Sequence, residues 1–332
     1  MLRSLITILV FLLPQAALGA PGQSLPPGER PVQVVAGFYL LDLSSVAERD
    51  ETFDADIYLK FQWHDPRQAF VGSESRMFLQ ESAAEQIGKM WWPQIEFVNT
   101  GQPEITNRRL EIYPDGTVDY DIGLTSRFRA HMDLRRFPFD RQGLDVRIQS
   151  FAWTAEQLEF VPDETGMDFS PESTFEGLLV TGVSGAAHQS EHAGWGRTFS
   201  EFVARIEVER RWTFFVWTVF VPVTLIFLVF CTVFLVPSTD FAARIDLSLT
   251  ALLACIATQF AMSFNLPHVS YLTVIDEVFL ATYFSIALGV ATSTGQAAWL
   301  KHEPERSERI DRRVGLGLPL LYFALLGISI LS

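Results

Sequence analysis

Residues 241–264 read FAARIDLSLTALLACIATQFAMSF, an apolar stretch of membrane-spanning length that contains an acidic residue. Side chains at alternating steps of four and three residues fall on one helical face. Here they are Asp246, Thr250, Leu253, Ala257, Phe260 and Phe264. Ionisable residues inside a membrane segment face a water-filled cavity or a partner rather than lipid. The stretch therefore predicts a helix that lines a water-filled path, with Asp246 meeting ions. The alternative is a helix start at which Asp246 pairs locally with Arg244.

Three further apolar segments predict a membrane part of four helices. The four segments run over about 212–236, 241–264, 272–298 and 314–332. Each approaches the ~20 residues that a helix needs to cross a bilayer. Pro222 should kink the first helix or have its freed backbone groups satisfied by neighbours. The basic loop 301–313 should stay in the cytoplasm, which places both chain ends outside.

The N-terminal part is expected to be exported. Residues 1–19 combine an apolar run with a small-residue end, which is typical of a secretory signal. Residues 20–211 would then form the exported domain, and residues 212–332 the membrane domain. Both cysteines, Cys231 and Cys255, lie in apolar segments, so no disulfide is expected in the exported part.

Residues 31–211 carry the pattern of half-buried strands. Apolar and polar residues alternate over 57–63, 144–149 and 202–209. Pro114-Asp115-Gly116 lies between two such runs and predicts a hairpin turn. Several strands separated by turns predict an antiparallel sandwich. One short helix is expected near Ser82–Lys89.

The formal net charge of −14 belongs mainly to the exported part, because the chain from Trp212 onward holds 8 acidic and 6 basic residues. An acidic surface argues against nucleic acid as a partner and concentrates cations near the protein. A solvated surface of a soluble domain would have the same composition. The sequence contains no nucleotide-binding loop and no supported catalytic triad.

The run His188-Gln189-Ser190-Glu191-His192 matches the H-x-x-E-H motif of inverted zinc proteases. That chemistry requires the motif to lie on a helix, whereas here glycines and alanines surround it. A protease is therefore not expected. His188, Glu191 and His192 remain a weak candidate for binding a metal ion. The simpler interpretation is a set of solvated residues on a loop over a ligand site.

The stretch 132–142, MDLRRFPFDRQ, resembles the signature loop of the prokaryotic pentameric ligand-gated ion channels of the Cys-loop receptor superfamily. Ala130 and Leu144 occupy the positions of the two cysteines that flank this loop in the animal receptors, as in prokaryotic members. Other matching stretches follow in the family's order, and together they cover the mature chain. They are the Tyr58–Trp63 strand, Trp91-Trp92-Pro93 with Glu96 and Asn99, and Arg210.

The resemblance implies a homopentamer around a central pore. Each subunit would place an extracellular all-β immunoglobulin-like sandwich above a four-helix transmembrane bundle, whose second helix lines the pore. The expected location is the inner (plasma) membrane, with multiple spans and a periplasmic N-terminal domain. The expected partners are further copies of the chain, the lipid bilayer, monovalent cations and a small organic ligand. Neither an enzymatic activity nor a cofactor is implied.

The resemblance also places a ligand site between subunits. One side would hold Glu96, Gln149, Phe151, Trp195 and Phe199, and the other side Tyr58 and Arg109. Aromatic faces beside an acid suit an organic cation such as an amine. Gln149 departs from this pattern, because amine-gated relatives carry an acid there. The alternative is that these aromatic residues belong to the sandwich core.

In the membrane domain, five copies of Asp246 would form an acidic ring that selects cations. Ala243 stands where related cation channels carry glutamate, so selection would rest on Asp246, assisted by Asp240. Leu253 and Phe260 are expected to form apolar constrictions that close the pore by dewetting. The alternative for both is ordinary helix packing.

A third set of residues should couple the two domains at their junction. The resemblance assigns this role to Phe137, Pro138, Phe139, Asp140, Arg210 and Pro267. Asp140 and Arg210 are expected to form a buried pair that is costly to break. The alternative is a screened surface pair with little energetic effect.

Two classes of function remain open. The first is a ligand-gated cation channel, with a proton-gated or anion-selective channel of the same fold as its variants. The second is a binding or enzymatic module that the helices merely tether to the membrane. The periodic face from Asp246 to Phe264 favours the first class, since a tether needs no polar-to-apolar stripe.

Overall fold

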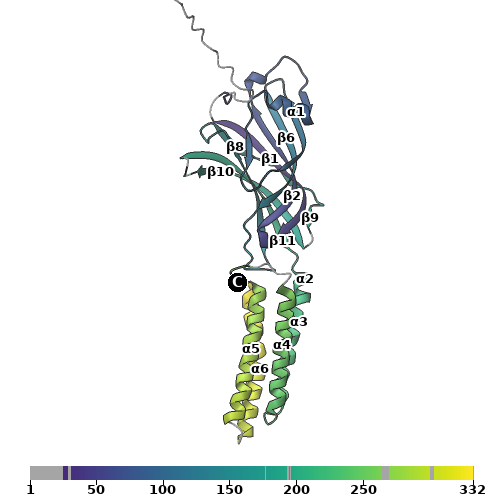
Figure 1. The fold of residues 1–332 in the computed structure, drawn as a ribbon, viewed down its shortest axis with the longest axis vertical. Helices are drawn as coiled ribbons and strands as arrows, with labels where there is room; N and C mark the ends of the chain where they lie inside the picture. The colour runs from purple at the N-terminus through teal and green to yellow at the C-terminus, as the bar shows by residue number, and fades with distance from the viewer. Residues whose placement is uncertain are drawn as a thin grey trace, which may run out of the picture.

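The structure is a computed structural model with a β-sandwich stacked on a bundle of helices (Figure 1). It describes residues 25–28, 31–175, 177–192, 194, 196–263, 269–299 and 303–331. The expected secretory segment 1–19, Trp195, Phe264 and Pro267 lie outside the described residues. The expected all-β domain followed by four apolar helices is confirmed.

The described strands of the sandwich form two sheets. The six-stranded sheet has the order β3 (Arg76–Leu79), β5 (Glu104–Ile112), β6 (Thr117–Arg129), β2 (Thr52–His64), β1 (Val32–Ala47) and β8 (Leu158–Phe169). The five-stranded sheet has the order β4 (Ile95–Phe97), β7 (Arg141–Ser150), β11 (Arg197–Arg210), β10 (Leu178–His192) and β9 (Thr174–Phe175).

One strand pair departs from the antiparallel arrangement that the turns predict. Strands β1 and β8 run parallel, with Val34 opposite Phe160. The chain leaves the first sheet, contributes β7 to the second and only then returns as β8 to the edge beside β1. A parallel pair needs such a crossover and cannot be joined by a tight turn. The local hairpin signals therefore give no hint of it.

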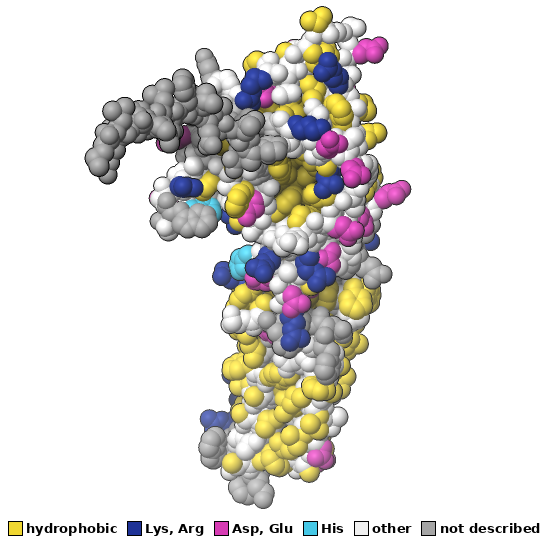
Figure 2. All heavy atoms as spheres, turned by 45° about the horizontal axis from the view of Figure 1, so that its top comes forward, with side chains coloured by type: hydrophobic (Ala, Val, Ile, Leu, Met, Phe, Trp, Pro, Cys, Tyr) yellow, Lys and Arg dark blue, Asp and Glu magenta, His cyan; other side chains and the backbone are white. Residues whose placement is uncertain are grey.

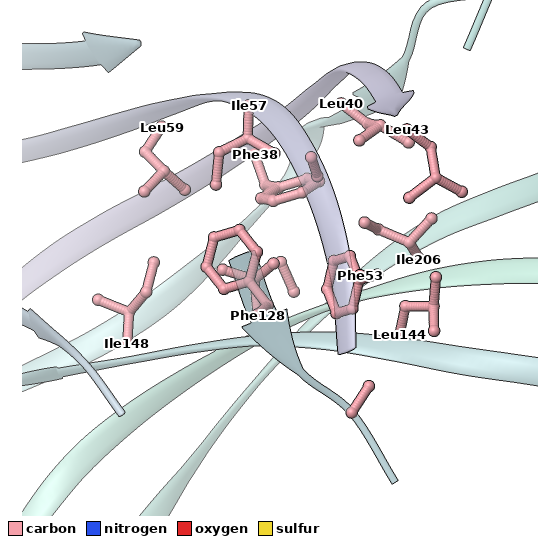
Figure 3. Packing of buried hydrophobic residues seen from close by; sticks show 14 of the residues in the cluster. Phe38, Leu40, Leu43, Phe53, Ile57, Leu59, Phe128, Leu144, Ile148 and Ile206 are labelled. Carbon is pink, nitrogen blue, oxygen red and sulfur yellow. The ribbon is translucent and has the colours of Figure 1, made fainter. Parts of the chain in front are cut away.

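The predicted alternation determines which side chains fill the sandwich. On β2, Ile57, Leu59 and Phe61 are buried, whereas the intervening Tyr58 and Lys60 face outward. Figure 3 shows Ile57 and Leu59 of this strand close to Phe38, Phe128 and Ile148. Burial of such a core is the main favourable term in folding. The same alternation determines which side chains lie on the outer faces of the sheets, where a ligand site can form.

The predicted hairpin turn at Pro114-Asp115-Gly116 connects β5 to β6. Gly116 has a φ of +90°, which disfavours residues with a Cβ. A Cβ there would also lie 2.6 Å from the carbonyl oxygen of Asp65. Asp115 Oδ1 accepts a hydrogen bond of 2.9 Å from the backbone N–H of Thr117. The turn is therefore held by its own side chain.

The predicted short helix is α1 (Gln80–Ile87), which starts two residues earlier than expected.

The first apolar span is continuous from Thr213 to Leu235. It comprises α2 (Thr213–Phe215), the π-helical turn η3 (Val216–Phe220), α3 (Val221–Cys231) and the 3₁₀ turn η4 (Thr232–Leu235). The π-helical turn ends at Phe220, two residues before Pro222, whose missing N–H cannot continue the regular ladder. The expected local adjustment at this proline is thus a change of helix type.

The other three spans are single helices. They are α4 (Phe241–Ser263), α5 (Val274–Trp299) and α6 (Pro304–Leu331). Helix α6 begins ten residues before its expected apolar segment, because the basic stretch also folds as helix. Helix α6 ends at the end of the bundle nearest the sandwich in Figure 1, as four spans require. Hydrophobic side chains cover much of the bundle surface in Figure 2, while charged side chains gather on the sandwich and at the junction.

A continuous apolar core connects the two domains. The cluster that fills the sandwich also includes Val219 and Phe220 of the first span and Val278 and Phe279 of α5. A second cluster lies deeper in the bundle, where Phe227 stacks on Tyr322 with ring centroids 3.9 Å apart. Gly289 permits close helix packing, since a Cβ there would lie 2.3 Å from Phe230 Cζ. The two domains therefore share one packed core, so a movement of one domain has to change contacts with the other.

Candidate functional site

The predicted polar-to-apolar face of α4 is exposed in the subunit. The exposed positions include Asp246, Thr250, Leu253, Ala257 and Phe260. Leu253 is 66% exposed and Phe260 is 67% exposed. Exposed apolar side chains of this size indicate a functional environment outside the bundle of one subunit. The alternative that Leu253 and Phe260 pack within the bundle of their own subunit is wrong.

The opposite face of α4 holds the helix against the bundle. Arg244, Ser248, Ala251 and Cys255 are buried on it. Successive residues of an α-helix turn by about 100°, which places these four roughly half a turn from the exposed set. Helix α4 packs against α3 and α5, and α6 packs against α3 and α5 as well. This arrangement leaves the Asp246 face of α4 directed away from its own subunit.

Arg244 does not pair with Asp246. Its guanidinium forms an ion pair with Asp311 of α6, with 2.6 Å between Nη2 and Oδ2. The alternative of a local pair at a helix start is therefore wrong, and Asp246 stays on the exposed face. Asp240 caps the helix instead, because its Oδ1 accepts a hydrogen bond of 3.2 Å from the N–H of Ala243.

The expected pair of Asp140 and Arg210 is buried at the domain junction. Arg210 Nε donates to Asp140 Oδ1 over 2.7 Å, and Arg210 Nη1 donates to Glu48 Oε1 over 2.7 Å. The guanidinium carbon also lies 4.5 Å from the ring centroid of Phe137. Burial alone would lower the pKa of Arg210, but Asp140 and Glu48 outweigh it and hold that pKa above its ordinary value. The alternative of a screened surface pair is wrong.

The loop with the FPFD sequence inserts its aromatic rings into the first span. The Phe137 ring meets the Phe215 ring at 4.8 Å between centroids. The Phe139 ring lies 5.9 Å from Trp212 and 5.7 Å from Phe220. Pro138 between them is buried. The loop is therefore packed into the top of the helical bundle.

The same loop touches the segment before α5. The backbone N–H of Leu134 donates to Tyr271 Oη over 2.9 Å. The Arg135 guanidinium lies 5.7 Å from the centroid of the Tyr271 ring. Gln142 closes the loop from inside, since its Nε2 donates to Asp140 Oδ2 over 2.6 Å and to the carbonyl of Asp133 over 2.7 Å. Sequence reasoning missed Glu48 and Gln142, because no spacing rule connects them to Arg210.

On the five-stranded sheet, one row of polar side chains crosses four strands. The register aligns Glu96 of β4, Gln149 of β7, Glu201 of β11 and His188 of β10. Directly opposite residues of antiparallel strands share a face. Ile148, the neighbour of Gln149, is buried in the core, so this row lies on the outer face.

Gln149 lies beside an aromatic pair on that outer face. His192 Nε2 and Gln149 Oε1 are 3.2 Å apart, and the His192 ring meets the Phe199 ring at 5.1 Å between centroids. Phe199 is only 5% exposed, yet it does not belong to the sandwich core cluster. Phe199 is thus a buried residue of the outer face, next to Gln149 and His192.

Glu201 is a further acid that sequence reasoning missed. It is fully buried beside Gln149 and is bound by the Arg147 guanidinium. His188 Nε2 lies 3.6 Å from Glu201 Oε2. The sequence shows Glu201 only as one polar position in an alternating strand. Its proximity to Gln149 depends on the register of β7 and β11.

Phe151 lies just beyond the end of β7 and is 70% exposed, which also excludes it from the core. Together with Glu96 it lines a cavity of about 650 Å³ whose walls include Trp92 and Arg108. Gln149 and Phe199 do not line this cavity. The described residues of this predicted side thus form two groups, Glu96 with Phe151 and Gln149 with Phe199.

Tyr58 and Arg109 lie on the outer face of the other sheet. They share a cavity of about 300 Å³ with Asp121 and Gly123. Arg109 forms ion pairs with Glu111 and, over 3.6 Å, with Asp121. Tyr58 lies over Gly123, where a Cβ would come within 2.7 Å of its ring. Within one chain the two predicted sides thus lie on different sheets and line two different cavities.

The predicted metal candidates do not assemble. His188, Glu191 and His192 lie on strand β10, not on a loop, and successive side chains of a strand point to opposite faces. Glu191 therefore points away from both histidines, which contact Glu201 and Gln149 respectively. In the part of the chain that the structure describes, no group of three or more metal-binding side chains comes together.

The sandwich also matches a known family. The family described as the neurotransmitter-gated ion-channel ligand binding domain matches residues 22–212. The chain belongs to this family. Its members are ligand-gated ion channels of the pentameric Cys-loop type and not enzymes.

Two relatives show how far the similarity to this family extends. The chain is 25% identical over 305 residues to a proton-gated ion channel of Gloeobacter violaceus, which covers 90% of this chain and 82% of that protein. It is 24% identical over 274 residues to the gamma-aminobutyric acid receptor subunit theta of Mus musculus, which covers 79% of this chain and 41% of that subunit. Both matches extend well beyond the sandwich into the helical part.

Proposed function

We propose that this protein is a ligand-gated channel for monovalent cations, built from five identical subunits around a pore lined by α4. It would lie in the inner membrane with its sandwich in the periplasm. A small organic ligand, bound between neighbouring sandwiches, would open it. The single observation that carries cation selection is the exposed face of α4, on which Asp246 stands without a basic neighbour of its own helix.

The electrostatic argument starts from the five-fold ring. Five carboxylates in a narrow passage raise the local concentration of cations and exclude anions. Arg244, the nearest base in the sequence, turns into the bundle and pairs with Asp311. Asp246 therefore supplies the net charge at this depth. Above it, Leu253 and Phe260 offer apolar rings at which a closed pore can lose its water.

The placement of the ligand residues favours a site shared by two subunits. Glu96, Gln149 and Phe199 lie on the outer face of one sheet, and Tyr58 lies on the outer face of the other. In a ring, one face of a subunit meets the other face of its neighbour. On one side Arg147 offsets Glu201 and leaves the charge of Glu96, and on the other side Glu111 and Asp121 exceed the single charge of Arg109, which favours a ligand with positive charge.

The aromatic residues give the first prediction. Phe199→Ala and Phe151→Ala should each shift the ligand dose-response to about 2- to 30-fold higher concentration, as the loss of one cation–π contact would. Ion selectivity should not change. Phe70→Ala is the matched control, because that ring packs against Arg76 at 3.9 Å and lines neither cavity. Equal shifts in all three variants would contradict a ligand site at Phe199 and Phe151.

The gate gives the second prediction. Leu253→Ser and Phe260→Ala should raise the leak current without ligand, because a more polar or wider constriction is wetted more easily. Leu320→Ser is the control, because Leu320 is an exposed leucine of α6 and lies outside the predicted pore helix. Currents are compared in planar bilayers at equal protein amounts. An unchanged leak in both gate variants would show that these side chains do not close the pore.

A flux screen tests the proposal as a whole. The purified protein is placed in liposomes with a fluorescent reporter of cation entry and is exposed to organic amines at fixed pH. A parallel series changes the pH without any organic ligand. Flux on addition of an amine is the expected result. Flux that follows pH alone, and is insensitive to Phe199→Ala, would instead assign the gating to protons.

A further inference from the structure

Arg244 is a buried arginine at the cytoplasmic end of the pore-side helix. It is the fourth residue of α4 and only 1% exposed, although Asp246, two residues later, is exposed. A buried charge is costly unless it is paired and hydrogen-bonded. The hydrogen bonds and the ion pair of this guanidinium therefore decide whether the side chain stays buried.

Every N–H group of Arg244 has an acceptor within reach. Nε and Nη2 donate to the carbonyl of Val236 over 3.0 and 2.5 Å. Nη1 donates to Gln296 Oε1 over 2.7 Å and to Asp311 Oδ1 over 3.0 Å. Nη2 also donates to Asp311 Oδ2 over 2.6 Å, which completes a bidentate pair. These acceptors follow or belong to the three other spans of the subunit.

The acceptors are themselves held in place. Gln296 Nε2 donates to Asp311 Oδ1 over 2.9 Å and to the carbonyl of Ser307 over 3.4 Å. Asp311 is 7% exposed and supplies the only negative charge among the described partners of Arg244. Without that charge, the guanidinium would be left buried and uncompensated, which is strongly unfavourable.

The side chain has an alternative position in water. The α4 end lies at the cytoplasmic mouth, and Asp246 offers a carboxylate on the exposed face close by in sequence. A released guanidinium would move toward that water and that carboxylate. Repeated in every subunit, this movement would bring positive charge to the depth at which the acidic ring selects cations.

We propose that Asp311 determines selectivity from outside the pore: it keeps Arg244 buried in the bundle and so leaves the Asp246 ring unopposed. This inference rests on the proposed role of α4 as the pore helix. Asp311 lies on α6, which packs on α3 and α5 and not along α4. It is a positioning residue, because it acts on ions only through Arg244.

The test measures single-channel cation conductance and zero-current potential in planar bilayers. Asp311→Asn should lower the conductance about two- to tenfold, the effect of one or a few unit charges at about 8 Å in a watery pore. The zero-current potential should shift toward that of chloride. Arg244→Gln in addition to Asp311→Asn should restore both values. Glu308→Gln, which removes an exposed acid one turn earlier on α6, is the matched control and should change neither.

Either of two results with the Asp311→Asn variants would overturn the proposal. One is an Asp311→Asn channel with unchanged conductance and zero-current potential. The other is a double variant that stays as low as Asp311→Asn, which would show a purely structural role. If Asp311→Asn does not assemble, the swap Arg244→Asp with Asp311→Arg keeps a buried pair and should conduct like the unmodified channel. Reduced cation preference in an assembled swap would also contradict the proposal.

The failure of this inference is distinguishable from the failure of the proposed function. If the unmodified channel prefers chloride, or if Asp246→Asn changes nothing, the assignment of the cation pore fails. If the unmodified channel prefers cations and responds to Asp246→Asn, but not to Asp311→Asn, only the role of Asp311 fails.

Discussion

Asp246→Arg should abolish the preference for cations or invert it. The exposed face of α4 carries this acid in each subunit, and its basic neighbour in sequence is withdrawn into the bundle. Exchange of five negative charges for five positive ones in a narrow passage reverses which ions are concentrated there. Asp246→Asn, which removes charge but retains size, should lower cation conductance with a smaller change in preference.

Zero-current potentials and single-channel conductances in asymmetric sodium chloride measure both effects. Asp240→Asn is the matched control, because asparagine retains the helix cap that Asp240 provides to Ala243. It should change conductance less than Asp246→Asn. Cation preference that survives Asp246→Arg in an assembled channel would contradict the assignment of α4 as the selecting helix.

Arg210→Ala should nearly abolish opening while ligand binding persists. The substitution leaves the buried Asp140, and the partly buried Glu48, at the junction without their cation, and removal of one partner of a buried pair costs about 3–5 kcal/mol. Ligand binding can open the pore only through contacts that differ between the resting and open states. The loop that holds Asp140 also holds Phe137 and Phe139 against the first span, so its disruption separates the ligand site from the pore.

A double-mutant cycle with Asp140→Asn measures the coupling. The two substitutions together should cost less than their sum, with an interaction of about 0.5–3 kcal/mol on the opening equilibrium. Ligand binding is measured separately on the same preparations. Arg211→Ala, at the adjacent exposed position, is the control and should leave opening intact. Strictly additive effects of Arg210 and Asp140 would show that the two do not act as a unit.

Much of the fold could be predicted from the spacing of apolar residues along the sequence alone. The alternation in β2 and β11 places the core, and the steps from Asp246 to Phe260 identify the face of α4 that its own subunit leaves exposed. Both depend on neighbours in sequence, for which strand and helix geometry are fixed. The pairing of Asp140 with Arg210 followed from the family resemblance and not from spacing.

The unpredicted contacts join residues that are distant in sequence. Glu48 reaches Arg210 across 162 positions, and Asp311 reaches Arg244 across 67. Glu201 lies beside Gln149 only because of the register between β7 and β11, and β8 runs parallel to β1 only after a crossover. Polar periodicity marks such residues as exposed, whereas tertiary packing decides that they are buried and paired.

The most direct test of cation selectivity is the zero-current potential of the unmodified protein across a tenfold sodium chloride gradient, with the channel opened in a planar bilayer. A cation channel should give a value near the sodium equilibrium potential, about 59 mV in magnitude for a monovalent ion at this gradient. A value of similar magnitude and opposite sign, which is the chloride equilibrium potential, would contradict the proposed function.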